Sequence, residues 1–578
     1  MVLCRGRLVL LGLALAALTC GFAAEENPQP ARPPAELNFN VTKTFDGHEF
    51  ACEMKLAGQE PGYQLYRFKF PSPVQSALPS NNTVYGKYYW PAGMSPNGEK
   101  RPAVVCLHIL SRDFTLVEIL CAALAGRGIP AAMIELPYYG ERLPPEMPNP
   151  ILADATIFPA ALAQAVQDTR RTIDMLQARP EVNAERIGLA GISLGGILTG
   201  TVAGLDERVY RAALVLAGGN LPRIVAFARE ASGLRESMQK LPEESRLRCD
   251  EALRACDPLA AAGKLRARAE AGRVLMYNAA EDEVIPRACT EELAAALGLK
   301  EQVRWLEGMT HYTALAALPK VLGGVCDFYA VDLPPSAAKA VAQPPKNLPQ
   351  DSVVLLLRDL SRAILFPDNE TATCCIVDLE ATGTHFKHKA TLRYLRSGGG
   401  RFRLEGDLPV LGKVALGQGE FPWLLSKNGV LFKGSKDVKP GRSPLAFADA
   451  SALNKAQAFG GVLSAFALFP SAMDVLVGFE SETTADGNLA VRANGKSKNV
   501  KGAAALLTLA KDGVTPCALH LESRGTVADV TVKEWRMNGP AAAGLFDPPQ
   551  SASIIVVEQE DLQRVFSAFF NHLLEEAD

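Results

Sequence analysis

Three polar residues, Ser193, Asp282 and His311, occur along the chain in the order serine, aspartate, histidine. One class of sites with a serine nucleophile has its residues in this order. A serine hydroxyl is a poor nucleophile at neutral pH, so it needs a base within hydrogen-bond reach and a carboxylate that orients the base. A loop aspartate alone is usually solvated, and a lone histidine is usually not catalytic. Because all three residues follow predicted strands, their conjunction predicts a catalytic triad.

Ser193 lies in a glycine-rich turn. Gly191, Gly195 and Gly196 surround it in the pattern G-x-S-x-G-G, between an apolar run at 187–190 and a helical segment. Glycines permit a sharp strand-to-helix reversal, in which Cβ atoms would clash. The helix N-terminus also favours developing negative charge. The motif alone is weak evidence, so the prediction depends on Asp282 and His311.

The surrounding sequence predicts an α/β fold in which strands and helices alternate. The predicted strands are 103–110, 130–136, 187–190, 211–217, 273–279 and 302–306, and the predicted helices are 114–125, 159–177 and 290–297, with a closing helix at 315–330. Residues 66–70 and 84–90 are rich in β-formers, and we expect them to be edge strands that lead into the larger sheet. Together these elements predict one domain over residues 37–330.

Residues 218–272 are helical in pattern, charged and free of strand signals. This is long for a connection in an α/β sheet, and it predicts a helical cap over the site. Residues 331–350 contain paired prolines among alanines and predict a linker.

Residues 351–578 have a different pattern, which predicts a smaller α+β domain. Alternating runs at 372–379, 390–395, 401–408, 423–432, 488–493, 503–509, 517–523 and 527–537 predict an antiparallel sheet. The pairs Asn428-Gly429 and Asp512-Gly513 predict hairpin turns. Helices are predicted at both ends, at 351–366 and 562–573.

The first residues of the chain predict a secretory signal at 1–23. Arg5 and Arg7 precede an apolar run at 8–18, and cleavage after Ala23 fits the small-x-small rule. The apolar run is too short for a membrane anchor, which needs roughly 20 residues.

Cys20 leaves a lipoprotein alternative open, although the residues before it fit a lipobox poorly. We therefore expect export to the periplasm or the exterior.

Composition excludes some classes of function. The 578-residue chain has a formal net charge of -3, without long runs of one sign, so nothing favours nucleic-acid binding. The 12 cysteines show no C-x-x-C spacing, and we predict neither a metal site nor a cofactor. The sequence leaves two alternatives for the cysteines: disulfides between Cys249 and Cys256 or between Cys106 and Cys121, or buried free thiols.

From about residue 60 to 330 the sequence resembles the α/β-hydrolase superfamily, and more narrowly secreted esterases of the dienelactone-hydrolase and acetyl-xylan-esterase type. The matching residues are 104–108, 137–142, Asp168, 186–196, 257–259, 282–286 and His311. Dienelactone hydrolases carry a cysteine nucleophile, so Ser193 indicates ester rather than lactone substrates.

The resemblance also implies an oxyanion hole. Its donors would be the backbone N–H of Leu194 and that of Ile109 or Leu110. The family commonly has small residues after His108, and the bulky pair found here predicts a narrow acyl pocket and short acyl groups. We expect substrate contacts from His108, Tyr138, Tyr139 and Glu141. The alternative for the last three is that they only pack together in a turn.

The second domain is faintly similar to periplasmic lipoprotein carriers, whose unclosed β-barrel holds acyl chains. Short segments at 394–405, 421–429 and 544–549 support this similarity. The similarity implies that the C-terminal domain binds a lipid or other apolar ligand. The alternative is an accessory domain that only positions substrate.

The sequence therefore predicts an exported serine esterase that acts on a small-molecule or polysaccharide-linked ester through an acyl-enzyme. Two alternatives stay open: a prolyl-oligopeptidase-like serine peptidase, although the usual β-propeller is absent, and a non-catalytic ligand-binding protein.

Overall fold

A computed structural model describes residues 35–335, except 61, 96–97 and 144–149, and much of 371–564. The gaps in the latter part are 384–385, 398–400, 409–411, 427, 436–474, 497–501, 512–514, 524–525, 541–543, 552, 559–560 and 562–563. The chain divides into two compact units, one of which contains residues 35–335 and the other most of the described residues that follow.

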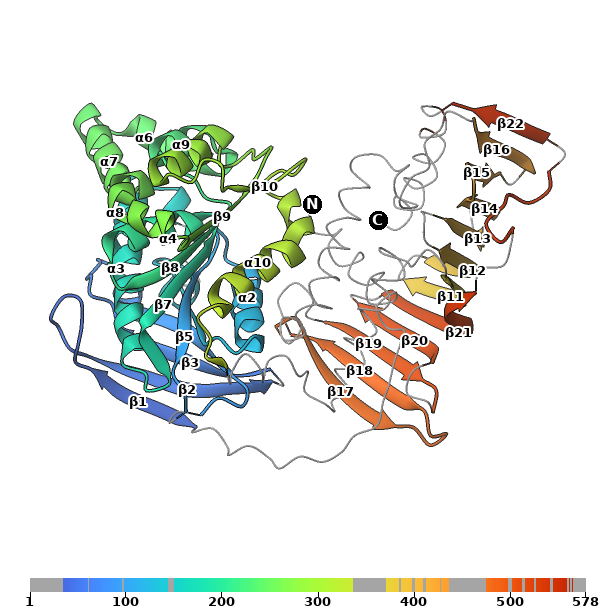
Figure 1. The fold of residues 1–578 in the computed structure, drawn as a ribbon, viewed down its shortest axis with the longest axis horizontal. Helices are drawn as coiled ribbons and strands as arrows, with labels where there is room; N and C mark the ends of the chain where they lie inside the picture. The colour runs from blue at the N-terminus through green and yellow to red at the C-terminus, as the bar shows by residue number, and fades with distance from the viewer. Residues whose placement is uncertain are drawn as a thin grey trace. The chain divides into compact units, whose positions relative to one another are not determined.

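The first unit is built on a mixed 10-stranded sheet (Figure 1). In spatial order its strands are β1 (Glu36–Val41), β2 (Phe50–Glu60), β3 (Tyr63–Pro71), β4 (Thr83–Pro91), β6 (Ala131–Ile134), β5 (Arg101–Leu107), β7 (Val182–Ile192), β8 (Val209–Val215), β9 (Val274–Ala279) and β10 (Arg304–Leu306). The strands from β6 to β10 pair in parallel, and β1 to β4 extend the sheet with antiparallel pairs.

Helices cover both faces of the parallel part of the sheet (Figure 1). They are α2 (Thr115–Gly126), α3 (Ile157–Gln177), α4 (Leu194–Leu205), α8 (Pro258–Glu270), α9 (Arg287–Leu297) and α10 (Leu318–Ala330). Helices α2 and α10 pack together on one face, and α3, α4 and α8 lie on the other. Strands β6 and β9 are consequently buried along their whole length, as expected for apolar runs in a parallel sheet.

The predicted α/β sheet is therefore confirmed, but its antiparallel part differs from the prediction. Strands β3 and β4 were expected at an edge, whereas each pairs with a neighbour on both sides. Strands β1 and β2 precede them and form the edge. In β2 the buried residues Phe50, Cys52 and Met54 alternate with exposed ones, a pattern typical of a half-buried strand that the sequence prediction missed.

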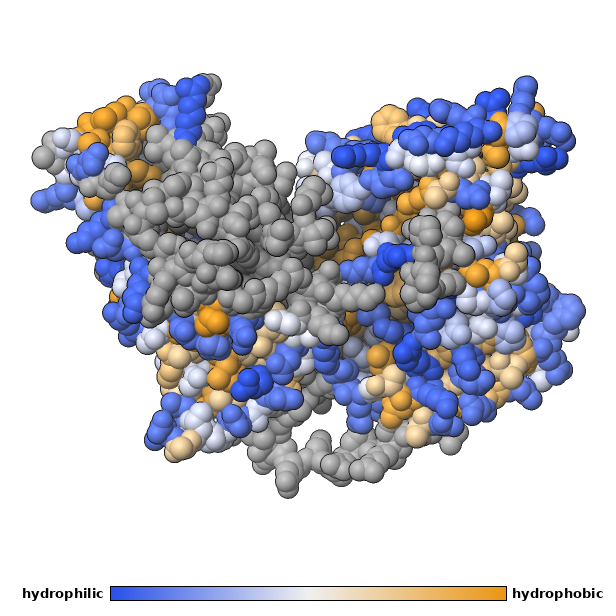
Figure 2. Space-filling view, turned by 180° about the vertical axis from the view of Figure 1, so that it is seen from behind, coloured by the Kyte–Doolittle hydropathy of each residue, from blue (hydrophilic) through white to orange (hydrophobic). Residues whose placement is uncertain are grey.

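The segment predicted as a cap is helical, as expected, but it contains two kinds of helix. After β8 come α5 (Leu221–Phe227), η4 (Arg229–Ala231), α6 (Ser232–Lys240), α7 (Glu243–Ala255) and α8. Helix α8 packs on α4, where a Cβ at Gly204 would lie 2.4 Å from Ala261 Cβ, so it belongs to the layer that covers the sheet. The additional helices are thus confined to residues 221–255. In Figure 2 the region of α6 and α7, at the upper right, is mainly hydrophilic.

The second unit contains a 12-stranded sheet (Figure 1). Its spatial order is β17 (Val477–Thr483), β18 (Leu489–Gly495), β19 (Ala503–Leu509), β20 (Pro516–Ser523), β21 (Thr526–Pro540), β11 (Thr371–Gly383), β12 (Phe386–Ser397), β13 (Phe402–Leu408), β14 (Gly412–Gln418), β15 (Pro422–Leu425), β16 (Val430–Gly434) and β22 (Ser553–Val557). Every pair is antiparallel except β16 and β22. The antiparallel sheet agrees with the sequence, whereas the two predicted terminal helices lie outside the described residues.

Two further sequence predictions can be compared with the described residues. Cys106, Cys121, Cys249 and Cys256 are all buried free thiols, the alternative that the sequence left open. The predicted signal at 1–23 lies outside the described residues. Within the described part of the chain, no helix is long and apolar enough to cross a membrane.

Because each unit has its own sheet, a fragment of residues 24–340 should fold by itself. We expect it to show one cooperative urea transition, monitored by circular dichroism, that coincides with a transition of the full chain. An aggregated fragment, or one that unfolds without cooperativity, would show instead that the two units share a core.

Candidate active site

Ser193 lies at the turn between β7 and α4. Its backbone conformation is one that residues other than glycine rarely adopt. Its φ is 55° and its ψ is -117°, and its N–H donates to the carbonyl of Val215 on the neighbouring strand (2.8 Å). Such strain persists only where surrounding structure enforces it, and it is typical of functional sites. The turn therefore presents Ser193 at the carboxyl end of the parallel strands, next to the first turn of α4.

The glycines around Ser193 are required by close approach of the backbone. A Cβ at Gly191 would lie 2.1 Å from the carbonyl oxygen of Gly195, and a Cβ at Gly195 would lie 2.1 Å from that of Leu107. Both distances are far below van der Waals contact. The start of α4 consequently packs directly against the end of β5, which brings the residues after Leu107 close to Ser193.

His311 and Asp282 complete a hydrogen-bonded chain with the serine. His311 Nε2 is 3.0 Å from Ser193 Oγ, and His311 Nδ1 is 2.8 Å from Asp282 Oδ2. Asp282 follows β9 and His311 follows β10, so three strand ends supply the three side chains. The structure thus brings together the residues that the sequence selected, in the predicted order of contact.

The neighbouring backbone fixes the orientation of this chain. Asp282 Oδ1 accepts the N–H groups of Val284 (2.9 Å) and Ile285 (2.7 Å). An ionised aspartate only accepts hydrogen bonds, so the proton between Asp282 and His311 resides on Nδ1 and leaves Nε2 free to accept from the serine hydroxyl. This arrangement has a general base positioned at the nucleophile.

Glu283 is a positioning residue that the sequence did not reveal. Its Oε2 accepts the backbone N–H of His311 at 2.7 Å and so ties the histidine loop to the aspartate loop. In the sequence, Glu283 is only a second carboxylate next to Asp282, and neighbouring carboxylates are frequent in surface loops. Glu281, on the other side, is exposed and has a backbone bond to Met309.

The predicted oxyanion donors lie around the junction of β5 and α4. Leu194 is the first residue of α4, and Ile109 and Leu110 follow β5. The hydrogen bonds of the described residues include none from these three backbone N–H groups. Free amides at a helix N-terminus and in an adjacent loop can stabilise a negative oxygen near Ser193.

His108 fixes the shape of the oxyanion loop. Its Nε2 accepts the N–H of Leu136 (3.1 Å), so Nδ1 carries the proton and donates to the carbonyl of Ile109 (2.7 Å). The same carbonyl accepts the N–H of Ser111 (2.8 Å). Because a peptide group is planar and trans, holding this carbonyl turns the N–H of Leu110 in the opposite direction. Both imidazole nitrogens are occupied by backbone, so His108 has no hydrogen bond left for a substrate.

The turn after β6 accounts for the remaining predicted contacts. Tyr138 has a φ of 65°, and its N–H donates to Asn81 Oδ1 (3.0 Å). Tyr139 is buried and packs edge-on against His108, with 4.7 Å between ring centroids. Glu141 pairs with Arg67 and lines a separate cavity over the antiparallel strands. Tyr139 and Glu141 thus support the turn, and Tyr138 is left half-buried among the candidates.

A fully buried ion pair holds this turn in place. Arg142 Nη1 is 2.8 Å from Asp168 Oδ2, and neither side chain is exposed. Arg142 also donates to the carbonyls of Glu135 (3.0 Å) and Asn81 (2.6 Å). Burial raises the pKa of Asp168, and the adjacent Arg142 opposes that rise. The pair connects the turn to α3 and thereby supports the loop that His108 orients.

Among the described residues, no group of three or more histidine, cysteine or acidic side chains could hold a metal ion.

The sequence comparison agrees with this site. Residues 163–311 match the model of the prolyl oligopeptidase family, a stretch that includes Ser193, Asp282 and His311. Together with the parallel sheet and the serine turn, this match decides the fold. The first unit has the α/β-hydrolase fold. No curated protein matched the chain.

Solved structures of esterases are similar to about half of the chain. An acetyl xylan esterase from Paenibacillus sp. R4 has 21% identity, a TM-score of 0.37 and coverage of 47% of this chain and 88% of that chain. Acetyl xylan esterase 1 from Thermoanaerobacterium sp. has 18% identity, a TM-score of 0.34 and coverage of 48% and 88%. A cold-adapted esterase from an Arctic intertidal metagenomic library has 18% identity, a TM-score of 0.30 and coverage of 48% and 97%.

The buried state of His108 predicts a pH dependence of stability. Burial lowers the pKa of His108 from 6.5 to about 4. The unfolded chain therefore takes up this proton before the native one, and stability falls as the pH drops from 6.5 towards 4. The loss attributable to His108 should be roughly 3 kcal/mol. Urea unfolding of the wild type and His108→Asn across this range measures the difference, and parallel curves would contradict it.

The Arg142 pair gives a second stability prediction. Arg142→Met leaves Asp168 buried without its partner, and we expect the free energy of unfolding in urea to fall by about 3–5 kcal/mol. Arg266→Met is the matched control, because Arg266 and Glu270 form an exposed pair that should contribute under ~0.5 kcal/mol. Equal effects of the two substitutions would show that the buried pair contributes no more to stability than the exposed pair does.

Proposed function

We propose that the α/β-hydrolase unit cleaves carboxylic esters through an acyl-enzyme on Ser193. The observation that supports this proposal is the unbroken chain from Ser193 Oγ through His311 to Asp282, with contacts of 3.0 and 2.8 Å. The side chains of Asp282 and His311 are 1% and 11% exposed, so little water competes for these hydrogen bonds. A non-catalytic binding protein would not need this arrangement.

In the proposed acylation, Ser193 Oγ attacks the ester carbonyl carbon while His311 Nε2 takes the hydroxyl proton. The imidazolium that forms is stabilised by Asp282, whose carboxylate stays ionised. The negative oxygen of the tetrahedral intermediate faces the backbone N–H groups of Leu194 and of the 109–110 loop. His311 then returns its proton to the alkoxide leaving group, the carbon–oxygen bond breaks, and the acyl group remains on Ser193.

Deacylation repeats these steps with water. His311 takes a proton from a water molecule, which attacks the acyl carbon, and the proton goes to Ser193 as the carboxylic acid leaves. Each step uses the same base and the same oxyanion donors, which explains why the three side chains act as a unit.

The surroundings of the serine favour short acyl groups. Ile109 and Leu110, half-buried and next to the predicted oxyanion amides, narrow the space that a small residue would leave open. Tyr312, which follows the catalytic histidine, donates a hydrogen bond to Glu230 of η4 and so ties the additional helices to the His311 loop. Long acyl chains would have to displace both groups.

Peptide hydrolysis is the second candidate, because the matching family model is that of prolyl oligopeptidases. The two candidates share the acyl-enzyme and differ in the leaving group. A panel containing acetyl and longer-chain nitrophenyl esters and a prolyl peptide anilide separates them. Turnover of the anilide in preference to every ester would replace esterase by peptidase as the proposed activity.

We expect Ser193→Ala to lower ester hydrolysis by at least ~10³-fold with unchanged folding, because the triad acts as a unit. Asp282→Asn should also cause a steep loss, since it removes the charge that stabilises the imidazolium. Glu281→Gln is the matched control and should retain activity. Steady-state rates with nitrophenyl acetate measure all three, and wild-type rates in Ser193→Ala would refute the assignment.

Acetyl esters should be hydrolysed with a higher kcat/KM than decanoyl esters. Replacing both Ile109 and Leu110 with alanine should shift the preference towards longer chains, because backbone donors are kept while space is gained. The ratio of kcat/KM for the two esters, in wild type and variant, is the measurement. A wild-type preference for decanoyl esters would contradict the crowding argument.

A further inference from the structure

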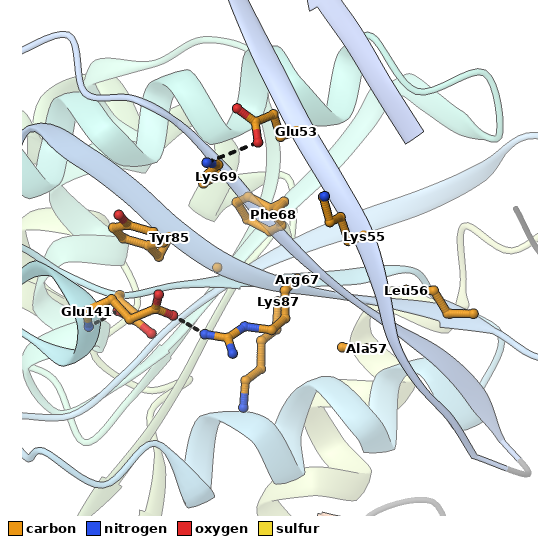
Figure 3. Close-up of a pocket in the computed structure, with 12 residues that line it drawn as sticks. Glu53, Lys55, Leu56, Ala57, Arg67, Phe68, Lys69, Tyr85, Lys87 and Glu141 are labelled. Carbon is orange, nitrogen blue, oxygen red and sulfur yellow. Dashed lines mark hydrogen bonds and ion pairs between the residues drawn. The ribbon is translucent and has the colours of Figure 1, made fainter. Parts of the chain in front are cut away.

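A cavity of about 260 Å³ lies over the antiparallel strands β2, β3 and β4 (Figure 3). Charged side chains of these strands surround it, and Glu135 and Glu141 close the side next to β6. None of the three triad residues lines it. The turn after β6 contributes Glu135 and Glu141 to the cavity, whereas its Tyr139 packs against His108.

Strand register places three cations in one row beside the cavity. Lys55 is the direct partner of Arg67, and Arg67 is the direct partner of Lys87. Like charges placed directly opposite destabilise a sheet, so such a row needs compensation. Lys55 is paired with Glu36 at 3.0 Å, and acidic partners also stand beside the other two.

Each of the four cations around the cavity therefore has an acidic partner. Arg67 pairs with Glu141, and Lys69 pairs with Glu53 at 3.0 Å (Figure 3). Lys87 pairs with Glu118. A strongly anionic or cationic ligand would find no net field of the opposite sign. Ammonium and guanidinium groups beside carboxylates instead offer hydrogen-bond donors and acceptors in alternation, which suits a ligand with several hydroxyl groups.

Tyr85 gives the cavity an aromatic surface. It is half-buried, and it lies on the same side of the sheet as Lys69, its direct partner on β3 (Figure 3). Phe68 and Leu56 also border the cavity, but both pack against the core on the other side of the sheet. An aromatic face beside polar groups matches a ring that has C–H faces and hydroxyl edges.

Glu135 places a carboxylate at the edge of the cavity. The residue is only 8% exposed, and its Oε2 accepts the backbone N–H of Glu141 at 2.7 Å. Burial raises the pKa of Glu135, against the lowering effect of Arg67 and Lys87. Because Oε1 is not enclosed by the protein and Glu135 lines the cavity, this oxygen can accept a hydrogen bond from a hydroxyl group in the cavity, as it does from water.

We propose that this cavity binds a sugar ring, with hydroxyl groups on Glu135 and the surrounding ion pairs and a C–H face on the ring of Tyr85. Its volume is just below the ~300 Å³ at the lower end of small-molecule sites, so the ligand is no larger than one ring. The site does not depend on the proposed esterase activity, because it shares no side chain with the triad.

Binding to the full chain tests this site directly. Xylose, glucose and N-acetylglucosamine would be titrated separately and followed by saturation-transfer NMR, with sulfate as an anionic comparison. We expect at least one sugar, and not sulfate, to bind. Tyr85→Ala and Glu135→Gln should each weaken that binding by about tenfold or more, since each removes one class of contact. Glu301→Gln, an exposed glutamate outside the cavity, is the control.

Labelling with a fluorophosphonate separates the two sites. Sugar binding should persist after Ser193 is labelled. If Ser193 cannot be labelled, the esterase proposal is refuted, but sugar binding should still be observed. The sugar site is overturned if no sugar binds, if sulfate binds instead, if the two cavity variants bind as the wild type does, or if labelling abolishes binding. Because either cavity variant could unfold, circular dichroism accompanies both, and Lys55→Met, at a largely exposed position, is the additional cavity variant.

Discussion

The turn at Ser193 leaves no space for a side chain at Gly191 or Gly195, and the site depends on this close packing. A Cβ at Gly195 would lie 2.1 Å from the carbonyl oxygen of Leu107, so β5 and α4 meet backbone to backbone. This contact places the N-terminus of α4 and the loop after β5 on either side of the serine. Residues with side chains at these glycines would force the two elements apart and separate the oxyanion donors from the nucleophile.

Polar groups behind the site keep the loops in register. His108 joins the loop after β5 to the loop after β6 through its two ring nitrogens, and the buried pair of Arg142 and Asp168 joins the latter loop to α3. Such groups are costly to bury, and each is compensated by a defined partner. The same loop after β6 borders the cavity over β2, β3 and β4 through Glu135, so one turn supports both sites.

Much of this could be predicted from the sequence. The parallel strands and their helices were visible because apolar runs alternate with helical periodicity, and the residues after three strand ends could be selected because their types fit one chemistry. The sequence prediction missed β1 and β2, although both alternate apolar and polar residues as a half-buried strand does. It also did not show that His108 binds backbone on both sides, or that Glu283 holds His311, since both depend on contacts between distant loops. The cation row of Lys55, Arg67 and Lys87 required strand register.

The most direct measurement of the central claim is the acyl-enzyme itself. Rapid acid quenching of the full chain during turnover of nitrophenyl acetate, followed by peptide mass spectrometry, should find one acetyl group on Ser193 and a burst of nitrophenol of matching amplitude. The Ser193→Ala variant should show neither. A burst-free reaction whose acetyl group resides on another residue, or on none while wild-type hydrolysis proceeds, would contradict nucleophilic catalysis by Ser193.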